Sequence, residues 1–353
     1  MEFLRNKILS RRDVLKLGAL GTLGAVGANL LAPKKPAIAQ AKDALHAQAS
    51  EHAHHALHSA ALPCNCGMST AQLLAATEMN PTKFLTAFDY GKVSKLPDGR
   101  TLREYEVVAE DKTIEVAGGV TFNAWLLNGF VPGPTLRATE GDLMRVKFIN
   151  QGAHPHSLHF HGIHPANMDG MEAIPKGGSF TYEFTAEPFG LHLYHCHVMP
   201  LKRHIHKGLY GTFIVDPKKP RPPATEMVMM MNGFDLDQDN ENEFYTVNGV
   251  AFWFVENPIE LKVNERVRVY LVNITEFDPI NSMHLHANFF HYYPTGTNLT
   301  PSDYTDTIML CQGERGIMEF EYKTPGRYMF HAHQSEFAEL GWLGFFNVKP
   351  SAL

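Results

Sequence analysis

Short runs of alternating apolar and polar residues fill the chain after Leu102. Three clear examples are LMRVKFI (143–149), SFTYEF (179–184) and LYGTFIV (209–215), with Gly, Pro and Asn between the runs. A period of two residues gives a segment one apolar and one polar face, as in a half-buried strand. Repeated along the chain, this pattern predicts an all-β fold built from β-sandwiches.

The strand pattern occurs twice. LNGFVPGPTLRATEGDLMRVKFIN (127–150) resembles VNGVAFWFVENPIELKVNERVRVYLVN (247–273), and two His-x-His pairs follow each copy. The Pro-rich stretch PKKPRPP (217–223) separates the copies, and proline cannot continue the interior of a sheet. We therefore expect two tandem copies of one β-domain, at residues 101–218 and 219–353.

Residues 1–39 have the form of a targeting segment. SRRDVLK (10–16) is a twin-arginine pattern, a Gly-rich apolar stretch follows, and AIA (37–39) is a small-x-small cleavage site. The alternative, a membrane anchor, is less favoured because the apolar stretch is short and interrupted by Gly and Asn29. We expect twin-arginine export to the periplasm or extracellular space, and no membrane span in the mature chain.

Residues 40–100 separate this segment from the strand pattern. The Ala- and His-rich part, 40–63, predicts a flexible extension, and a short helix is expected within 69–90. The chain has 31 basic and 37 acidic residues, of which seven and two lie in residues 1–39, so the mature chain has a formal net charge of −11. Such a charge argues against nucleic acid and anionic membranes as partners.

The chain has 20 histidines and four cysteines. Cys64 and Cys66 are too close to pair comfortably with each other; either could pair with Cys311, and a disulfide framework is not expected. If the 20 histidines were placed at random along the chain, about one His-x-His pair would be expected. The sequence contains pairs at 52/54, 154/156, 159/161, 195/197, 204/206, 284/286 and 331/333.

The pair at 195/197 encloses a cysteine, in HLYHCHVMP (192–200). In a strand, His195 and His197 point to one face and Cys196 to the other, so the three cannot ligate one ion. They can serve two metal sites on opposite faces of one strand. A zinc site is the simpler alternative, but four histidine pairs provide more ligands than one tetrahedral zinc ion needs.

The motifs LHFHG, YHCH, MHLHA and FHAH, with NGFVPGPTLR upstream, resemble those of the multicopper oxidases. The similarity covers residues 102–349 and is greatest to two-domain, laccase-like members with blue copper in the first domain only. It implies two tandem cupredoxin-like Greek-key β-sandwiches and four coppers per chain: one type 1, one type 2 and two type 3. The implied trinuclear ligands are His159 and His284 for the type 2 ion, and His161, His195, His197, His286, His331 and His333 for the type 3 pair.

The resemblance also implies a type 1 site with Cys196 as the thiolate and His156 as one imidazole ligand. A blue site needs two His, one Cys and a weak axial group. The second imidazole comes from HIHKGLYG (204–211). His204 fits best because Leu209 then occupies the axial position five residues later, with His206 as its rival and Met199 as a further axial candidate.

In the second domain the family's type 1 positions hold Asn281, Ala332, Phe337 and Trp342, so this site is expected to be lost. Asp169 matches the family's acidic residue beside the type 2 copper, where a carboxylate can relay protons. The alternative for Asp169 is a simple Asp-Gly turn.

The resemblance implies an oxidase that takes electrons from a phenol, Cu(I) or a redox protein and reduces O2 to water. Electrons would pass from the type 1 copper through Cys196 to the cluster. Because each domain offers half of the cluster's ligands, the family pattern implies a homotrimer. One rival is a copper nitrite reductase, which the complete set of four histidine pairs disfavours. Another is a copper-binding or electron-transfer protein without turnover.

Overall fold

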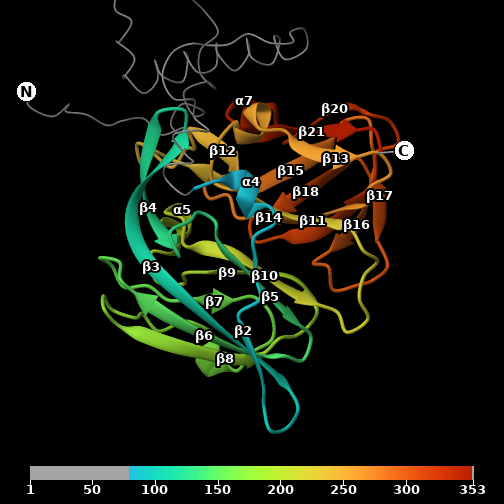
Figure 1. The fold of residues 1–353 in the computed structure, drawn as a ribbon. Helices are drawn as coiled ribbons and strands as arrows, with labels where there is room; N and C mark the ends of the chain where they lie inside the picture. Colours follow the sequence, from blue (N-terminus) through green and yellow to red (C-terminus); the bar gives the residue numbers. More distant parts are fainter. Residues whose placement is uncertain (1–78, 352–353) are drawn as a thin grey trace, which may run out of the picture. The chain divides into compact units, whose positions relative to one another are not determined.

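The computed structural model describes residues 79–351. The predictions for the targeting segment, the His-rich stretch, the pair His52/His54 and the thiols Cys64 and Cys66 lie outside these residues. Within 79–351 the regular structure is almost entirely β (Figure 1), which confirms the all-β prediction. No helix in this part of the chain is long and apolar enough to cross a membrane.

Two sheets from residues 88–216 pack face to face as the first sandwich. One has the strand order β1-β5-β10-β9-β7 and the other β2-β3-β6-β8, with β4 paired to β3. β5 pairs with β10, and β3 with β6, in parallel, as expected for crossovers between sheets. The strands are β1 Phe88–Asp89, β2 Lys92–Lys95, β3 Thr101–Ala117, β4 Val120–Leu127, β5 Gly133–Thr139, β6 Leu143–Asn150, β7 His159–Phe160, β8 Ser179–Thr185, β9 Gly190–His195 and β10 Tyr210–Asp216.

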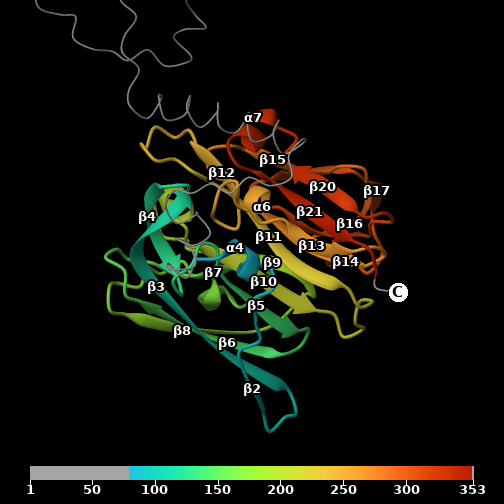
Figure 2. The same cartoon turned by 45° about the horizontal axis from the view of Figure 1, so that its top comes forward.

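The second sandwich repeats this plan (Figure 2). Its sheets have the orders β12-β11-β14-β19-β16-β17 and β13-β21-β20-β15-β18, and its parallel pairs are β11–β14 and β13–β21. The strands are β11 Thr225–Phe234, β12 Phe244–Val247, β13 Ile259–Lys262, β14 Val267–Asn273, β15 Ile280–Leu285, β16 Phe290–Pro294, β17 Asp303–Thr305, β18 Thr307–Cys311, β19 Arg315–Phe320, β20 Gly326–His331 and β21 Leu343–Lys349. The short helices are α4 Pro81–Phe84, η1 Ala166–Met168, α5 Leu201–His206, α6 Trp253–Glu256 and α7 Ser335–Glu339.

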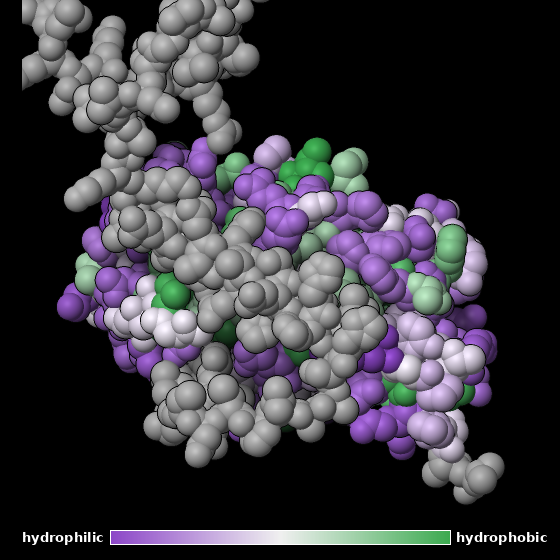
Figure 3. All heavy atoms as spheres, turned by 90° about the horizontal axis from the view of Figure 1, so that it is seen from above, coloured by the Kyte–Doolittle hydropathy of each residue, from purple (hydrophilic) through white to green (hydrophobic). Residues whose placement is uncertain are grey.

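The alternating runs in the sequence correspond to observed strands. The predicted strands at 143–149, 179–184 and 209–215 are β6, β8 and β10. In β6 the residues Met144, Val146 and Phe148 are buried, and the residues between them are less buried. The face seen in Figure 3 is mostly hydrophilic where it is described, with apolar side chains in small separate groups.

Strand structure begins before residue 101, where the first domain was expected to start. β1 pairs with β5, and β2 forms a hairpin with β3. All four residues of β2 are exposed, so this segment carries no apolar alternation that a sequence pattern could detect. The helix α4 lies within the range 69–90, and Asn80 caps it by accepting a hydrogen bond from the Lys83 N–H at 3.0 Å.

One hydrophobic core spans the second sandwich and part of the first, with residues from β3, β4, β9 and β10. In β11 every residue from Met227 to Phe234 is buried. Leu193 and Tyr210 of the first sandwich belong to the same core as these methionines. Because both faces of β11 are covered, its sequence is a continuous apolar run instead of an alternating one.

A buried ion network spans the Pro-rich linker. Arg137, whose side chain is 8% exposed, binds Asp216 at the end of β10 through two hydrogen bonds of 2.8 Å and Glu226 in β11 at 2.7 Å. Glu226 also accepts hydrogen bonds from Arg268 at 2.9 Å and from the Tyr270 hydroxyl at 2.7 Å. The network thus joins the last strand of the first sandwich to the first strand of the second.

We expect Arg137→Met to lower stability by about 3–5 kcal/mol, because it leaves two partly buried carboxylates without their shared cation. The thermal unfolding midpoint of the metal-free protein would measure this loss. Arg145→Met is the matched control, since Arg145 also binds two carboxylates but its side chain is 37% exposed, and we expect at most about 1 kcal/mol there. Equal losses in the two variants would contradict the prediction.

The same variant should change the acid dependence of stability. Burial raises the pKa of Glu226, but hydrogen bonds from Arg137, Tyr270 and Arg268 outweigh it and hold the pKa below the usual 4.5. The resulting stabilisation is present above pH 4.5 and is lost as the pH falls through the pKa of the folded state. Arg137→Met should therefore lose less stability than the unsubstituted protein on acidification through this range.

Candidate metal centre

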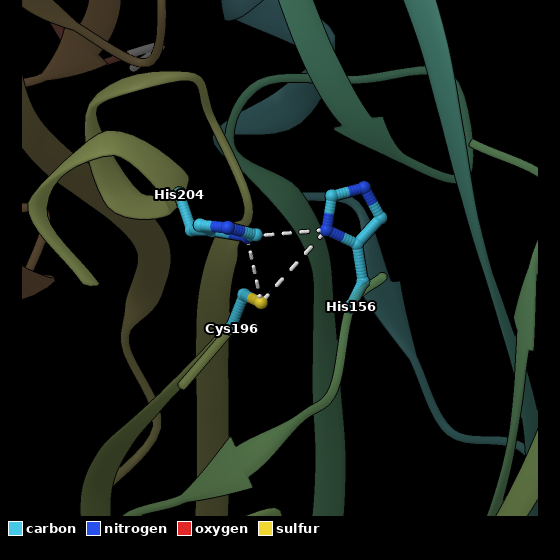
Figure 4. A group of neighbouring side chains, drawn as sticks. All are labelled: His156, Cys196 and His204. Carbon is cyan, nitrogen blue, oxygen red and sulfur yellow. Dashed lines mark hydrogen bonds between the residues drawn. The ribbon is translucent and has the colours of Figure 1, made fainter. Parts of the chain in front are cut away.

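Cys196, His156 and His204 converge in the interior of the first sandwich (Figure 4), and we call these three residues the thiol–imidazole group. Cys196 Sγ lies 3.2 Å from His204 Nδ1 and 4.0 Å from His156 Nδ1, and the two Nδ1 atoms are 3.2 Å apart. Cys196 is 0% exposed, His156 is 1% exposed and His204 is 4% exposed. Three potential ligand atoms therefore face one small volume that is closed to solvent.

The backbone around Cys196 fixes this geometry. β9 ends at His195, Cys196 follows it, and α5 carries His204 near its end. The chain then returns, so that the Cys196 N–H donates to the Leu209 carbonyl at 2.9 Å and the Leu209 N–H donates to the His204 carbonyl at 3.3 Å. From the other side, His156 forms a backbone bridge with Ile174.

The structure brings His204, and not His206, to Cys196. His206 Nε2 accepts a hydrogen bond from the Asp235 N–H at 2.8 Å. Of the two axial candidates, Leu209 is fully buried in the same hydrophobic cluster as Cys196, whereas Met199 is 76% exposed. The geometry therefore favours the set His156, Cys196, His204 and Leu209.

Burial controls the protonation of this group. It raises the pKa of the Cys196 thiol and lowers the pKa of His156 to about 3 and of His204 to about 4. The sulfur and the two Nδ1 atoms lie within 4.0 Å of one another, and His156 Nε2 has no hydrogen-bond partner among the described residues. A soft cation could be held by both Nδ1 atoms and the sulfur, and this donor set is that of a blue copper site.

His159, His161, His195 and His197 form a first histidine quartet. His159 in β7 is the cross-strand partner of His195 in β9, and the Nε2 atoms of His161 and His195 are 3.2 Å apart. The ring of His197 lies 5.3 Å from that of His159. Burial lowers the pKa of His161 to about 3 and of His195 to about 4, which keeps both rings neutral and able to bind a metal.

His284, His286, His331 and His333 form a second quartet with the same arrangement. His284 in β15 is the cross-strand partner of His331 in β20, and the Nε2 atoms of His286 and His331 are 3.0 Å apart. The ring of His333 lies 5.3 Å from that of His284. Within residues 79–351, no group of converging ligand atoms combines histidines of both quartets.

Hydrogen bonds fix the tautomers of four of these histidines. The Nδ1 atoms of His159 and His284 lie 3.0 Å from the carbonyl oxygens of Asp169 and Asp306. The Nδ1 atom of His195 lies 2.9 Å from the Cys196 carbonyl, and His331 makes the equivalent bond to Ala332. A carbonyl only accepts, so each Nδ1 carries the proton and each Nε2 is free to bind a metal.

Asp169 lies both in a turn and beside the quartet. Gly170 has a φ of +76°, and a Cβ there would lie 2.0 Å from the Leu158 carbonyl oxygen, so this turn requires glycine. The Asp169 carboxylate is 3.2 Å from His159 Nδ1 and 3.7 Å from His164 Nε2. Two of these residues were not predicted from the sequence: His164, which is in no His-x-His pair, and Asp306, a half-buried residue between β17 and β18 that belongs to no motif.

The second sandwich keeps the backbone of the loop around Cys196 but not its candidate ligands. The Ala332 N–H donates to the Trp342 carbonyl at 3.1 Å, and the Trp342 N–H donates to the Phe337 carbonyl at 2.9 Å. These bonds repeat those around Cys196, with Ala332, Phe337 and Trp342 at the positions of Cys196, His204 and Leu209. Asn281, at the position of His156, is fully buried and donates to the Thr275 hydroxyl at 3.3 Å.

Two family models described as multicopper oxidase match this chain, at residues 108–220 and 220–352. A solved structure described as a multicopper oxidase has 58% sequence identity to it and a TM-score of 0.77, over 78% of this chain and 99% of that chain. A copper nitrite reductase from Nitrosomonas europaea has 27% identity and a TM-score of 0.65, over 70% of this chain and 94% of its own.

The copper-containing nitrite reductase of Neisseria meningitidis serogroup A is 30% identical over 247 residues, which is 63% of this chain and 63% of that protein. The chain therefore spans less than two thirds of the length of this curated relative.

Substitution of the two candidate histidines should separate their roles. In copper-loaded protein, we expect His204→Gln to remove the blue absorption band, because it removes an atom 3.2 Å from the thiol sulfur. His206→Gln should retain the band, and Cys196→Ser supplies the baseline without a thiolate. Visible absorption at equal copper content measures all three, and loss of the band in His206→Gln alone would contradict the assignment.

Proposed function

Because this chain belongs to the multicopper oxidases, in their two-domain form, we propose that it is a laccase-like oxidase. It would couple the one-electron oxidation of a reducing donor to the four-electron reduction of O2 to water. One observation carries the proposal: the buried thiol–imidazole group and two histidine quartets coexist in one chain. An electron carrier needs only the first of these.

The proposed copper content is four ions per chain. His156, Cys196 and His204 would hold one type 1 ion, with Leu209 in the axial position. The eight quartet histidines would hold one type 2 and two type 3 ions. Bound copper would supply reversible one-electron transfer and the reduction of O2, while the protein supplies the ligand geometry.

Cys196 is the proposed connection between the two kinds of site. Its sulfur faces His156 and His204, and its backbone leads directly to His195 and His197. The Cys196 carbonyl also accepts a hydrogen bond from His195 Nδ1 at 2.9 Å, which adds a second short connection to the covalent one. We assign electron transfer to this segment for that reason.

Reduction of O2 to water consumes four protons, and we assign their delivery to the Asp169 carboxylate. Its Oδ1 is 3.2 Å from His159 Nδ1. The side chain is 37% exposed, so it can exchange protons with solvent while it contacts the quartet.

We propose a homotrimer in which the first quartet of one protomer faces the second quartet of the next. Each quartet alone offers four imidazoles, and the described residues of one chain do not bring the quartets together. Exposed apolar side chains lie close to both quartets in the sequence: Ile163 is 61% exposed, Met171 63%, and Phe289 47%. Apolar groups left at an open site favour its coverage by another chain.

Copper nitrite reduction is the rival activity, because such enzymes are among the relatives. The family pattern of these reductases has an aspartate where this chain has His159, and three histidines around one type 2 copper. The complete second set of histidine pairs supports the oxidase. The twin-arginine pattern of residues 10–16 supports export to the periplasm or beyond.

The proposed function predicts four coppers per chain at saturation and O2 uptake with an added reductant. Copper counting and oxygen consumption should be measured on protein lacking residues 40–63, so that the His-rich stretch contributes no metal. Nitrite added without O2 should not restore donor oxidation. A finding of two coppers per chain, together with nitrite-dependent donor oxidation, would contradict the oxidase proposal and support a nitrite reductase.

The assembly predicts that a charge beside one quartet will disrupt both oligomer and cluster. Ile163→Asp, two residues after His161, should shift sedimentation from trimer towards monomer and lower the cluster copper, while the blue band remains. Val93→Asp is the control, because Val93 is 53% exposed on the β2 hairpin. Full activity in a monomer by ultracentrifugation at nanomolar concentration would refute the trimer.

A further inference from the structure

Trp125 contacts both imidazoles of the thiol–imidazole group. Its ring centroid lies 5.1 Å from that of His156 and 4.9 Å from that of His204, with interplanar angles of 56° and 61°. The indole therefore packs against both histidine ligands at once. None of the motifs in the sequence analysis includes this residue.

Hydrogen bonds on both sides fix the backbone of Trp125. In β4 it is paired with Asp111 of β3, and its N–H donates to the Lys207 carbonyl at 2.8 Å. The Asp111 carboxylate in turn accepts a hydrogen bond from the Ala153 N–H at 2.8 Å, which holds the loop before His156. The strand, the α5 end and this loop are thus all tied together around the indole.

The outer side of Trp125 faces two exposed residues. The His154 ring lies 4.8 Å from the indole, and the Arg203 guanidinium carbon lies 5.6 Å from its ring centroid. Trp125 itself is 7% exposed, whereas His156 and His204 are 1% and 4% exposed. The indole therefore forms a layer between the buried ligands and the exposed pair.

A second approach to the group passes Gly152. A Cβ at Gly152 would lie 3.1 Å from His156 Nε2, so the backbone of Gly152 lies close to that edge of the imidazole. Gly152→Ala would therefore add a methyl group there and obstruct this second approach. The two approaches lie at different residues and can be blocked separately.

We propose that Trp125 is the positioning residue that couples a donor docked at His154 and Arg203 to the thiol–imidazole group. This rests on the proposed function. Since the ligands are almost fully buried, the donor class is an outer-sphere one-electron reductant, which does not ligate the site. One electron leaves the donor for the site, the donor departs oxidised by one electron, and Trp125 is unchanged.

The packing explains why an aromatic residue suits this role. Electronic coupling decays less steeply through atoms in contact than across a gap, and the indole fills the space between both ligands and the exposed pair. The guanidinium of Arg203 lies over the face of the Trp125 ring, and this cation–π contact stabilises the neutral indole. The positive charge beside the ring also makes oxidation of the indole less favourable. Trp125 thus serves as a bridge and not as a radical site.

The kinetic test uses anaerobic reduction of the blue band by hexacyanoferrate(II), followed by stopped flow. Trp125→Leu removes the aromatic plane and should slow reduction by about tenfold, and Trp125→Phe by about threefold. The blue band and the reduction potential should stay unchanged. Trp253→Phe, at a buried tryptophan of the second sandwich that donates to Thr82, should reduce at the normal rate.

A second measurement does not depend on electron transfer from a donor. Loading of copper(II) should quench tryptophan fluorescence in parallel with the appearance of the blue band. Trp125→Phe should lose most of this quenching, and Trp253→Phe should keep it. Equal quenching in these two variants would show that Trp125 has no privileged contact with the site.

The outcomes separate this assignment from the proposed function. Normal reduction rates in Trp125→Leu would overturn the assignment, as would a change in the potential or the blue band large enough to account for the slower rate. So would slowing in Gly152→Ala alone, which would place the donor at the Gly152 edge. No blue band in the unsubstituted protein would overturn the proposed function itself.

Discussion

Extended backbone sends consecutive side chains to opposite faces, and at residues 195–197, where β9 ends, this places a thiol and two imidazoles on opposite sides of one backbone. β9 is held in register from both sides, because His195 pairs with Tyr210 of β10 and with His159 of β7. A shift of one residue would exchange the thiol with an imidazole and destroy both the thiol–imidazole group and the quartet. The strand pairing therefore sets the distance between the two kinds of site as well as the ligands of each.

The two sandwiches show how little of the fold is specific to metal binding. The two hydrogen bonds that close the loop after Cys196 recur between the equivalent positions after Ala332. The difference lies in side chains. Phe337 stacks on Tyr245 at 4.0 Å, and Trp342 is fully buried, so apolar rings fill the volume that the candidate ligands occupy in the first sandwich. The backbone of a repeated sandwich can thus be kept while the side chains at these positions change from potential ligands to apolar rings.

Apolar alternation and histidine spacing were sufficient to predict the strands β6, β8 and β10 and the pairing of histidines on one face, because both depend on the two-residue period. The choice between His204 and His206 could not be made in this way. Both lie in α5, where residues two apart point in different directions, so only one of them reaches Cys196. His164, Asp306 and Trp125 were missed because their roles depend on contacts between segments distant in sequence or outside any repeated motif.

The proposed assembly has an electrostatic basis in the quartets themselves. Burial lowers the pKa of His161, His195, His286 and His331, so these four rings are neutral near pH 7 and add no positive charge where two quartets would approach each other. Cations bound between the quartets would need compensating negative charge. Asp169 and Asp306, whose carbonyls orient His159 and His284, also provide carboxylates beside each quartet. Because ions held by both halves would bind the proposed assembly more tightly than separate protomers, metal binding and association would stabilise each other.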